Sequence, residues 1–154
     1  MTAPLDILAP VAGRTMAMAD VDDPVFSAGY VGPGVAIDPD PEAGRDAVAP
    51  NDGTIVKVHP HAFVIAGSDG RGVLVHLGIN TVQLDGDGFT VHHQQGDTVQ
   101  RGDVLISWDP AAVEAGGRSA VCPVVALEAP ADALTDAPAD GTDVTVSDTL
   151  FVWG

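Results

Sequence analysis

The stretch Ala47-Val-Ala-Pro-Asn-Asp-Gly-Thr-Ile-Val56 has the same pattern as the earlier stretch Ile7-Leu-Ala-Pro-Val-Ala-Gly-Arg-Thr-Met16. Each contains Ala-Pro-x-x-Gly followed by residues suited to a β-strand. Two copies of a pattern indicate a duplicated β unit, because a solenoid would need more repeats. We therefore expect two similar β units within one fold.

Turn-forming residues recur along the rest of the chain, for example in Asn51-Asp-Gly53, Ser68-Asp-Gly70 and Asp85-Gly-Asp-Gly88. Short runs of Val, Ile, Thr and Phe lie between them, a pattern that predicts short strands joined by tight turns. The best helical candidate is the short segment Asp109-Pro-Ala-Ala-Val-Glu-Ala115, with Pro110 in its first turn. The sequence predicts an all-β fold, an antiparallel sandwich or barrel with an internal duplication and little helix.

The length of 154 residues suits a single domain that spans the whole chain. Cys122 is the only cysteine, so an internal disulfide is excluded. The first residues lack the basic start and apolar core of a signal peptide. No apolar run approaches the roughly 18 residues of a membrane helix. We expect a cytoplasmic protein with no direct membrane insertion.

The charge is strongly acidic, with 22 Asp and Glu against 6 Lys and Arg, a formal net charge of −16, and Lys57 as the only lysine. Such a surface disfavours nucleic acid and anionic membranes as partners. The acidic excess favours solubility, and it would also steer a basic partner protein.

His76 lies in the apolar run Gly72-Val-Leu-Val-His-Leu-Gly-Ile-Asn-Thr-Val82. In strand geometry Leu74, His76 and Gly78 share one face. Leu74 would exclude water there, and Gly78 would leave room beside the ring. A histidine in an apolar strand is more often a half-buried structural residue than a reactive one. The run by itself therefore leaves both interpretations open.

His59 and His61 flank Pro60, which favours a strand edge or a loop at this point. Nucleophilic serine or cysteine chemistry is disfavoured, because no Gly-x-Ser-x-Gly motif occurs and Cys122 has no nearby histidine. Two hypotheses remain. One is a zinc-binding β-fold hydrolase or metal module that uses His59, His61 and His76. The other is a phosphoryl carrier, in which one neutral imidazole attacks and a second donates a hydrogen bond.

Several short motifs follow one another along the chain: Ala9-Pro-Val-Ala-Gly13, Asp23-Pro-Val-Phe26, Val31-Gly-Pro-Gly-Val-Ala-Ile37, Ala49-Pro-Asn-Asp-Gly-Thr54, His61-Ala-Phe63, Val75-His-Leu-Gly-Ile-Asn-Thr-Val82, Gly88-Phe89, Gly96-Asp97, Gly102-Asp103 and Cys122-Pro-Val-Val125. In this order they resemble the glucose-type enzyme IIA domains of the phosphoenolpyruvate-dependent sugar phosphotransferase system, especially the actinobacterial ones. The resemblance covers nearly the whole chain, and the block around His76 is its most specific part.

The resemblance implies a β-sandwich in which His76 accepts a phosphoryl group from the carrier protein HPr. His76 then passes the group to the IIB domain of a sugar permease, of glucose or N-acetylglucosamine type, and His61 supports the transfer. The carbonyl of Gly78 would hold the other ring nitrogen of His76. No cofactor is required, although zinc can bind incidentally at His61 and His76. The phosphorylation state would also control docking to permeases or metabolic enzymes.

The resemblance further implies a shallow apolar depression whose rim docks the partners in turn. The rim residues would be Asp23, Val25, Phe26, Val31, Phe63, Leu74, Gly78, Asn80 and Val82. Two positions depart from the family pattern. His59 stands where many members have a hydroxyl residue, so His61 must be oriented differently. Asn80 stands where an acidic residue is common, which leaves Asp23 as the acid at the rim.

Overall fold

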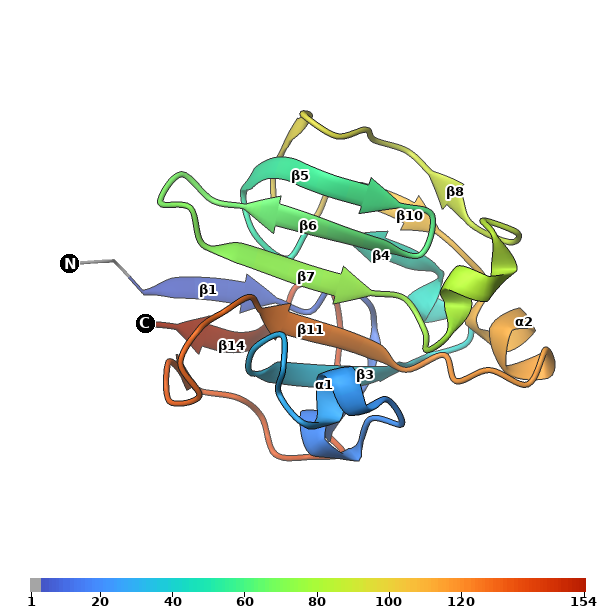
Figure 1. Cartoon of the computed structure of the whole chain (residues 1–154), viewed down its shortest axis with the longest axis horizontal. Coiled ribbons are helices and arrows are strands. Elements are labelled where there is room, and N and C mark those ends of the chain that lie inside the picture. Colours follow the sequence, from blue (N-terminus) through green and yellow to red (C-terminus); the bar gives the residue numbers. More distant parts are fainter. Residues whose placement is uncertain (1–3) are drawn as a thin grey trace.

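The computed structural model of the protein describes residues 4–154 and consists mainly of three antiparallel sheets (Figure 1). The largest has eight strands in the order β13-β2-β3-β11-β7-β6-β5-β9, and the others have the orders β1-β14-β12 and β4-β10-β8. These sheets confirm the predicted all-β fold with little helix.

The strands are β1 (Leu5–Leu8), β2 (Gly13–Ala17), β3 (Gly34–Pro39), β4 (Asp46–Val48), β5 (Gly53–His59), β6 (Ala62–Ala66), β7 (Gly72–His76), β8 (Thr90–Val91), β9 (Thr98–Val99), β10 (Val104–Ser107), β11 (Cys122–Ala126), β12 (Leu134–Thr135), β13 (Asp143–Val144) and β14 (Thr149–Trp153). The helices are α1 (Pro24–Ser27) and α2 (Pro110–Ala115), and the 3-10 turns are η1 (Met18–Asp20), η2 (Ala43–Arg45) and η3 (Thr81–Leu84). The predicted helix at 109–115 is present, with the Asp109 side chain as its N-cap.

The duplicated β unit is visible in both the strand order and the hydrogen bonds. The Ala-Pro-x-x-Gly motifs join β1 to β2 and β4 to β5. The two copies cross reciprocally, since Leu8 N donates to the Pro50 carbonyl at 2.9 Å and Val48 N donates to the Pro10 carbonyl at 2.8 Å. The large sheet likewise consists of two matching halves, β13-β2-β3-β11 and β9-β5-β6-β7, joined between β11 and β7.

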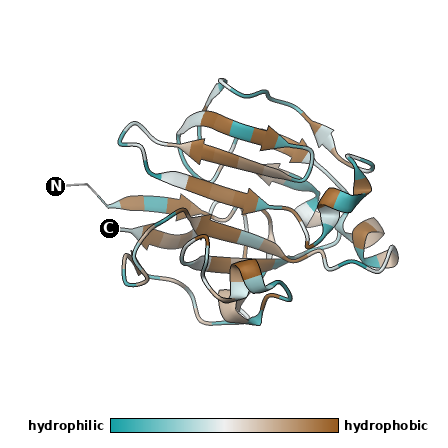
Figure 2. Cartoon of the chain, viewed as in Figure 1, coloured by the Kyte–Doolittle hydropathy of each residue, from teal (hydrophilic) through white to brown (hydrophobic). Residues whose placement is uncertain are grey.

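The main core is enclosed by all three sheets. Ile7, Ile37, Ile55, Leu105 and Phe151, from β1, β3, β5, β10 and β14, are fully buried in it. Figure 2 shows that the strands carry most of the hydrophobic residues, whereas the connecting loops are largely hydrophilic. Burial of these side chains away from water is the main favourable term in folding.

A second, smaller apolar cluster lies on the outer face of the large sheet. The segment from η1 to Val31, which contains α1, covers part of that face in front of β3 and β11 (Figure 1). Phe26 of α1 packs there with Ala36 of β3 and Val125 of β11. Farther along the same face the side chains of β7 and β6 are only partly covered, and the site described below is located there.

Along the part of the chain that the structure describes, no helix has the length and apolar character required to cross a bilayer.

Candidate functional site

The strands β6 and β7 bring His61 and His76 together. His76 is the last residue of β7 and pairs with Ala62, the first residue of β6. His61 precedes Ala62 in the two-residue turn between β5 and β6, and its carbonyl accepts a hydrogen bond from Leu77 N at 2.7 Å. As a result, the two imidazole rings meet edge to face, with centroids 5.0 Å apart and planes at 71°.

One nitrogen of His76 is held by the backbone. Nδ1 lies 2.6 Å from the Gly78 carbonyl oxygen, the contact that the resemblance implied. Because a carbonyl can only accept, Nδ1 carries the proton, and the neutral ring therefore keeps its free lone pair on Nε2. This tautomer is the one that a nucleophilic Nε2 requires.

Gly78 has a different role from the one that strand alternation predicted. The strand β7 ends at His76, so only Leu74 and His76 share the outer face, and Gly78 lies in the following turn with φ +80°. A side chain at this position would strain the backbone, and its Cβ would lie 2.6 Å from Thr81 Cγ2 and 3.0 Å from the Ser119 carbonyl. Glycine therefore allows the turn that directs its own carbonyl toward the His76 ring.

Both histidines have lowered pKa values. Burial lowers the pKa of His76, while the hydrogen bond to Gly78 and the charge of Asp23 act in the opposite direction. Burial also lowers the pKa of His61, to about 4, with smaller contributions from His76 and His59. The two rings are consequently neutral at neutral pH, so His76 keeps a free lone pair on Nε2 and the neutral His61 ring carries one N–H that can donate a hydrogen bond.

The short helix α1 brings two rim residues to the histidines. Asp23 is its N-cap, and the Asp23 carboxylate accepts a hydrogen bond from Val25 N at 2.9 Å. The ring of Phe26 lies 5.3 Å from the His76 ring, centroid to centroid. Phe26 is buried beneath α1, whereas Val25 is 47% exposed. The helix therefore places both a carboxylate and apolar surface next to His76.

The other rim residues fall into three groups. Val31 and Leu74 are partly buried in the outer cluster. Val82 is 63% exposed in η3, and Asn80, which precedes it, is exposed with φ +61°. Phe63 does not reach the site: it pairs with Val75 on the inner face of the sheet and is 1% exposed in the main core. Strand alternation turns Phe63 away from Ala62 and Val64, so we leave it out of the docking surface proposed below.

An apolar hollow of about 630 Å³ continues from Leu74 across the outer face of β5, β6 and β7. It is lined by Tyr30, Val31, Val56, Lys57, Val64, Leu74, Leu127 and Glu128. Sequence reasoning missed Tyr30, which is 78% exposed in a loop between two positive-φ glycines, Gly29 and Gly32, although exposed aromatic residues are a signal for binding surfaces.

The exposure of Val56 in this hollow does not follow from simple alternation of residues along β5. The pairing of β5 with β6 shifts register between Ile55 and Lys57, so Val56 and Lys57 are both exposed and both line the hollow. A bulge of this kind interrupts the simple alternation of strand faces, and it has no clear sequence signature here.

The zinc hypothesis gains no support from the geometry. Residues 4–154 include no group of three or more His, Cys, Asp or Glu side chains that could hold a metal ion. His59 stacks on His61 with ring centroids 5.9 Å apart and planes at 23°. The lone pairs of stacked rings lie in nearly parallel planes, an arrangement that does not suit convergence on one ion in the tetrahedral geometry that zinc prefers.

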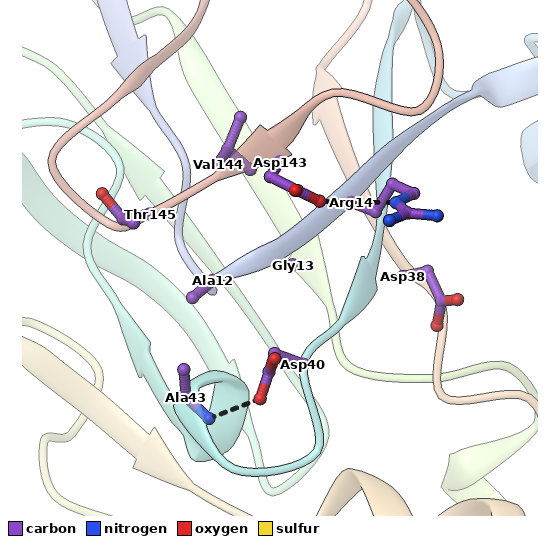
Figure 3. Close-up of a pocket in the computed structure, with 9 residues that line it drawn as sticks. All are labelled: Ala12, Gly13, Arg14, Asp38, Asp40, Ala43, Asp143, Val144 and Thr145. Carbon is purple, nitrogen blue, oxygen red and sulfur yellow. Dashed lines mark hydrogen bonds and ion pairs between the residues drawn. The ribbon is translucent and has the colours of Figure 1, made fainter.

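A separate hollow lies at the other edge of the large sheet, between β2, β3 and β13 (Figure 3). It contains the exposed ion pair between Arg14 and Asp143, with N and O 3.3 Å apart, and Asp40, which accepts a hydrogen bond from Ala43 N. The full lining is Ala12, Gly13, Arg14, Asp38, Asp40, Ala43, Asp143, Val144 and Thr145. This lining has no histidine, cysteine or aromatic ring, so the candidate site remains the histidine pair.

Comparison with known proteins gives one family and several relatives. The sequence model of the phosphoenolpyruvate-dependent sugar phosphotransferase system, EIIA 1, matches residues 5–131. The mannose-specific EIIBCA component of Corynebacterium glutamicum is 39% identical over 127 residues, which are 81% of this chain but only 18% of that protein. The glucose-specific EIIA component of Haemophilus influenzae is 42% identical over 123 residues, 79% of this chain and 72% of that protein.

A solved structure agrees with the sequence matches. The glucose permease IIA from Mycoplasma capricolum superposes with a TM-score of 0.89 at 31% identity, over 98% of this chain and 96% of that one. Sequence and structure comparisons thus lead to the same group of proteins.

The low pKa of His61 predicts a specific loss of stability in acid. The unfolded chain protonates His61 near 6.5, whereas the folded chain does so only near about 4. Between these values the unfolded state binds more protons, so the free energy of unfolding falls as the pH falls. Urea unfolding measured at about pH 7.5 and about pH 4.5 gives the free energy of unfolding at each pH. The decrease in this free energy from the higher to the lower pH should be smaller for His61→Gln than for the parent. An equal loss in the two proteins would contradict the pKa assigned to His61.

Proposed function

Because the chain belongs to the EIIA 1 family of the phosphoenolpyruvate-dependent sugar phosphotransferase system, we propose that His76 is the residue on which it carries a phosphoryl group. Membership makes the chain a phosphotransferase component of a sugar transport system. We propose phosphohistidine on HPr as the donor, the IIB domain of a sugar permease as the acceptor, and one IIA domain over the whole chain. The main support for the His76 assignment is the bond from Nδ1 to the Gly78 carbonyl, which leaves Nε2 free.

In the first transfer, the Nε2 lone pair of His76 attacks the phosphorus atom on the donor histidine. A new N–P bond forms while the donor N–P bond breaks, and its electron pair stays on the donor imidazole. The His76 ring gains positive charge as the bond forms. The Gly78 carbonyl and the negative charge of Asp23 both favour a positive charge on His76, so they stabilise the transition state and the phosphorylated ring. In the transfer to IIB, a nucleophile of that domain attacks the phosphorus, the bond between phosphorus and His76 Nε2 breaks, and its electron pair returns to Nε2.

His61 would assist by donating a ring N–H to an oxygen of the phosphoryl group. Its ring lies edge to face with His76, within reach of a group bonded to that residue. With a pKa of about 4, His61 is neutral at neutral pH. A neutral donor makes a weaker hydrogen bond than a cation does, so it positions the phosphoryl group without holding it too tightly for onward transfer.

The surface around the histidines would dock HPr and IIB in turn. Val25 and Val82 provide exposed apolar contacts, and Phe26, Val31 and Leu74 support them from below. The name of the Corynebacterium relative combines EIIB, EIIC and EIIA components, and this chain matches a small part of it, which supports a IIB domain as the acceptor.

We propose that the permease, and not this chain, determines the sugar. Relatives named as mannose-specific and glucose-specific match this chain at similar identities, 39% and 42%, which supports this proposal. Glucose and N-acetylglucosamine permeases remain our proposed acceptors, and phosphorylation-dependent binding of other permeases or metabolic enzymes is a proposed regulatory role.

The central assignment predicts one phosphoryl group per chain after incubation with phosphoenolpyruvate, enzyme I and HPr. Intact mass spectrometry under neutral conditions should detect it in the parent and in His92→Ala, a control at an exposed histidine outside the site. The variant His76→Ala should gain none. A phosphoryl group that persists in folded His76→Ala would refute His76 as the acceptor.

The supporting role of His61 predicts a defect in transfer without a loss of acceptance. In His61→Gln, phosphorylation should still reach one group per chain, because His76 is intact. The side-chain amide cannot reproduce the geometry of the imidazole N–H, so the defect should appear in the next step. Onward transfer to IIB should slow on the order of a hundredfold, which is the lower end of the range of rate losses seen when one preorganised hydrogen-bond donor is removed. Rapid-quench kinetics with the isolated IIB domain measures this step. Equal rates for the variant and the parent would remove His61 from the mechanism.

A further inference from the structure

A third histidine extends the row of rings at the site. His59 is the last residue of β5, and its ring stacks on that of His61 with centroids 5.9 Å apart and planes at 23°. His61 in turn meets His76 at 5.0 Å. The order of the rings is therefore His59, His61, His76, from the last residue of β5 to the last residue of β7.

The backbone of the turn keeps the first two rings together. His59 pairs with Ala62 across the hairpin, and the proline ring fixes φ of Pro60 between the two histidines. The carbonyl of His61 is also anchored by Leu77 N at 2.7 Å. Two adjacent elements thus determine where the Cα atoms of His59 and His61 lie, so their stacking does not depend on a freely moving loop.

The ring of His61 has fewer restraints than its backbone. Over residues 4–154, its imidazole nitrogens make no hydrogen bond to another residue, in contrast to His76 Nδ1, which is bonded to Gly78. The χ2 torsion of histidine has a broad, roughly two-fold profile, so packing determines the orientation of an unbonded ring. Two rings pack against the His61 ring: His76 meets it edge to face, and His59 stacks on it.

We propose that His59 is a positioning residue for phosphoryl transfer, which acts by stacking on His61 and holding the His61 N–H toward the group on His76. This inference rests on the function proposed above and adds a residue to it. Among residues 4–154, the ring contacts join His59 to His61 and His61 to His76, so His59 acts on the reacting group through His61. Its contribution is the shape of its aromatic ring, so another flat ring at this position serves equally well.

The test uses two variants and a matched control. His59→Ala removes the ring, His59→Phe keeps a flat ring without nitrogens, and His92→Ala makes the alanine substitution at an exposed histidine without a ring neighbour among the described residues. Each protein is first phosphorylated with phosphoenolpyruvate, enzyme I and HPr, and the stoichiometry is measured by mass. Transfer to the isolated IIB domain is then followed by rapid quench over a range of IIB concentrations.

We expect full phosphorylation of every protein. At saturating IIB, His59→Ala should transfer about threefold to tenfold more slowly than the parent, the size expected for losing one aromatic contact. The IIB concentration at half saturation should stay unchanged, because docking is intact. His59→Phe and His92→Ala should transfer at the parent rate.

Three results would overturn the inference. Equal rates for His59→Ala and the parent would show that the stacked ring is dispensable. A His59→Phe variant that transfers as slowly as His59→Ala would mean that the imidazole nitrogens of His59 are required. A change only in the IIB concentration at half saturation would make His59 a docking contact. A parent that accepts no phosphoryl group would instead refute the proposed function together with this inference, so the two failures are distinguishable.

Discussion

The hydrogen bond from His76 Nδ1 to the Gly78 carbonyl depends on a turn that glycine makes at low cost. Two further bonds stabilise this turn, from Thr81 Oγ1 to the Leu77 carbonyl at 2.7 Å and from Ile79 N to the Ser119 carbonyl at 2.9 Å. The bonds connect the end of β7 to η3 and to the segment before β11. The tautomer of one imidazole is thus determined by contacts among three segments of the chain, which leave the lone pair of Nε2 free.

The duplicated fold explains why the site lies on one half of the large sheet. His76 pairs with Ala62 in one half, and Val125 pairs with Gly34 at the matching position in the other. Val125 packs beneath Phe26, and the ring of Phe26 reaches His76. One half therefore supports the covering helix α1, while the other provides the histidines, and the proposed docking surface lies where the two meet.

Sequence reasoning predicted the all-β fold, the duplication and the pairing of His61 with His76, because turn residues, repeated motifs and family motifs are local signals. It placed Phe63 at the rim and Gly78 on the face of a strand, because both depend on where strands end and which face points inward. The hollow beside Leu74 was missed for a related reason. The bulge at Val56 and the position of Tyr30 arise from tertiary packing, which overrides the simple alternation of faces.

The claim that the Gly78 carbonyl makes Nε2 of His76 the phosphoryl acceptor is tested most directly by long-range ¹H–¹⁵N correlation spectra. The protein would be labelled with ¹⁵N and phosphorylated through enzyme I and HPr. The account predicts that only the His76 ring shows the pattern of an imidazole bonded to phosphorus, with phosphorus on Nε2 and a proton retained on Nδ1. Phosphorus on Nδ1 of His76, or on any other histidine, would contradict it.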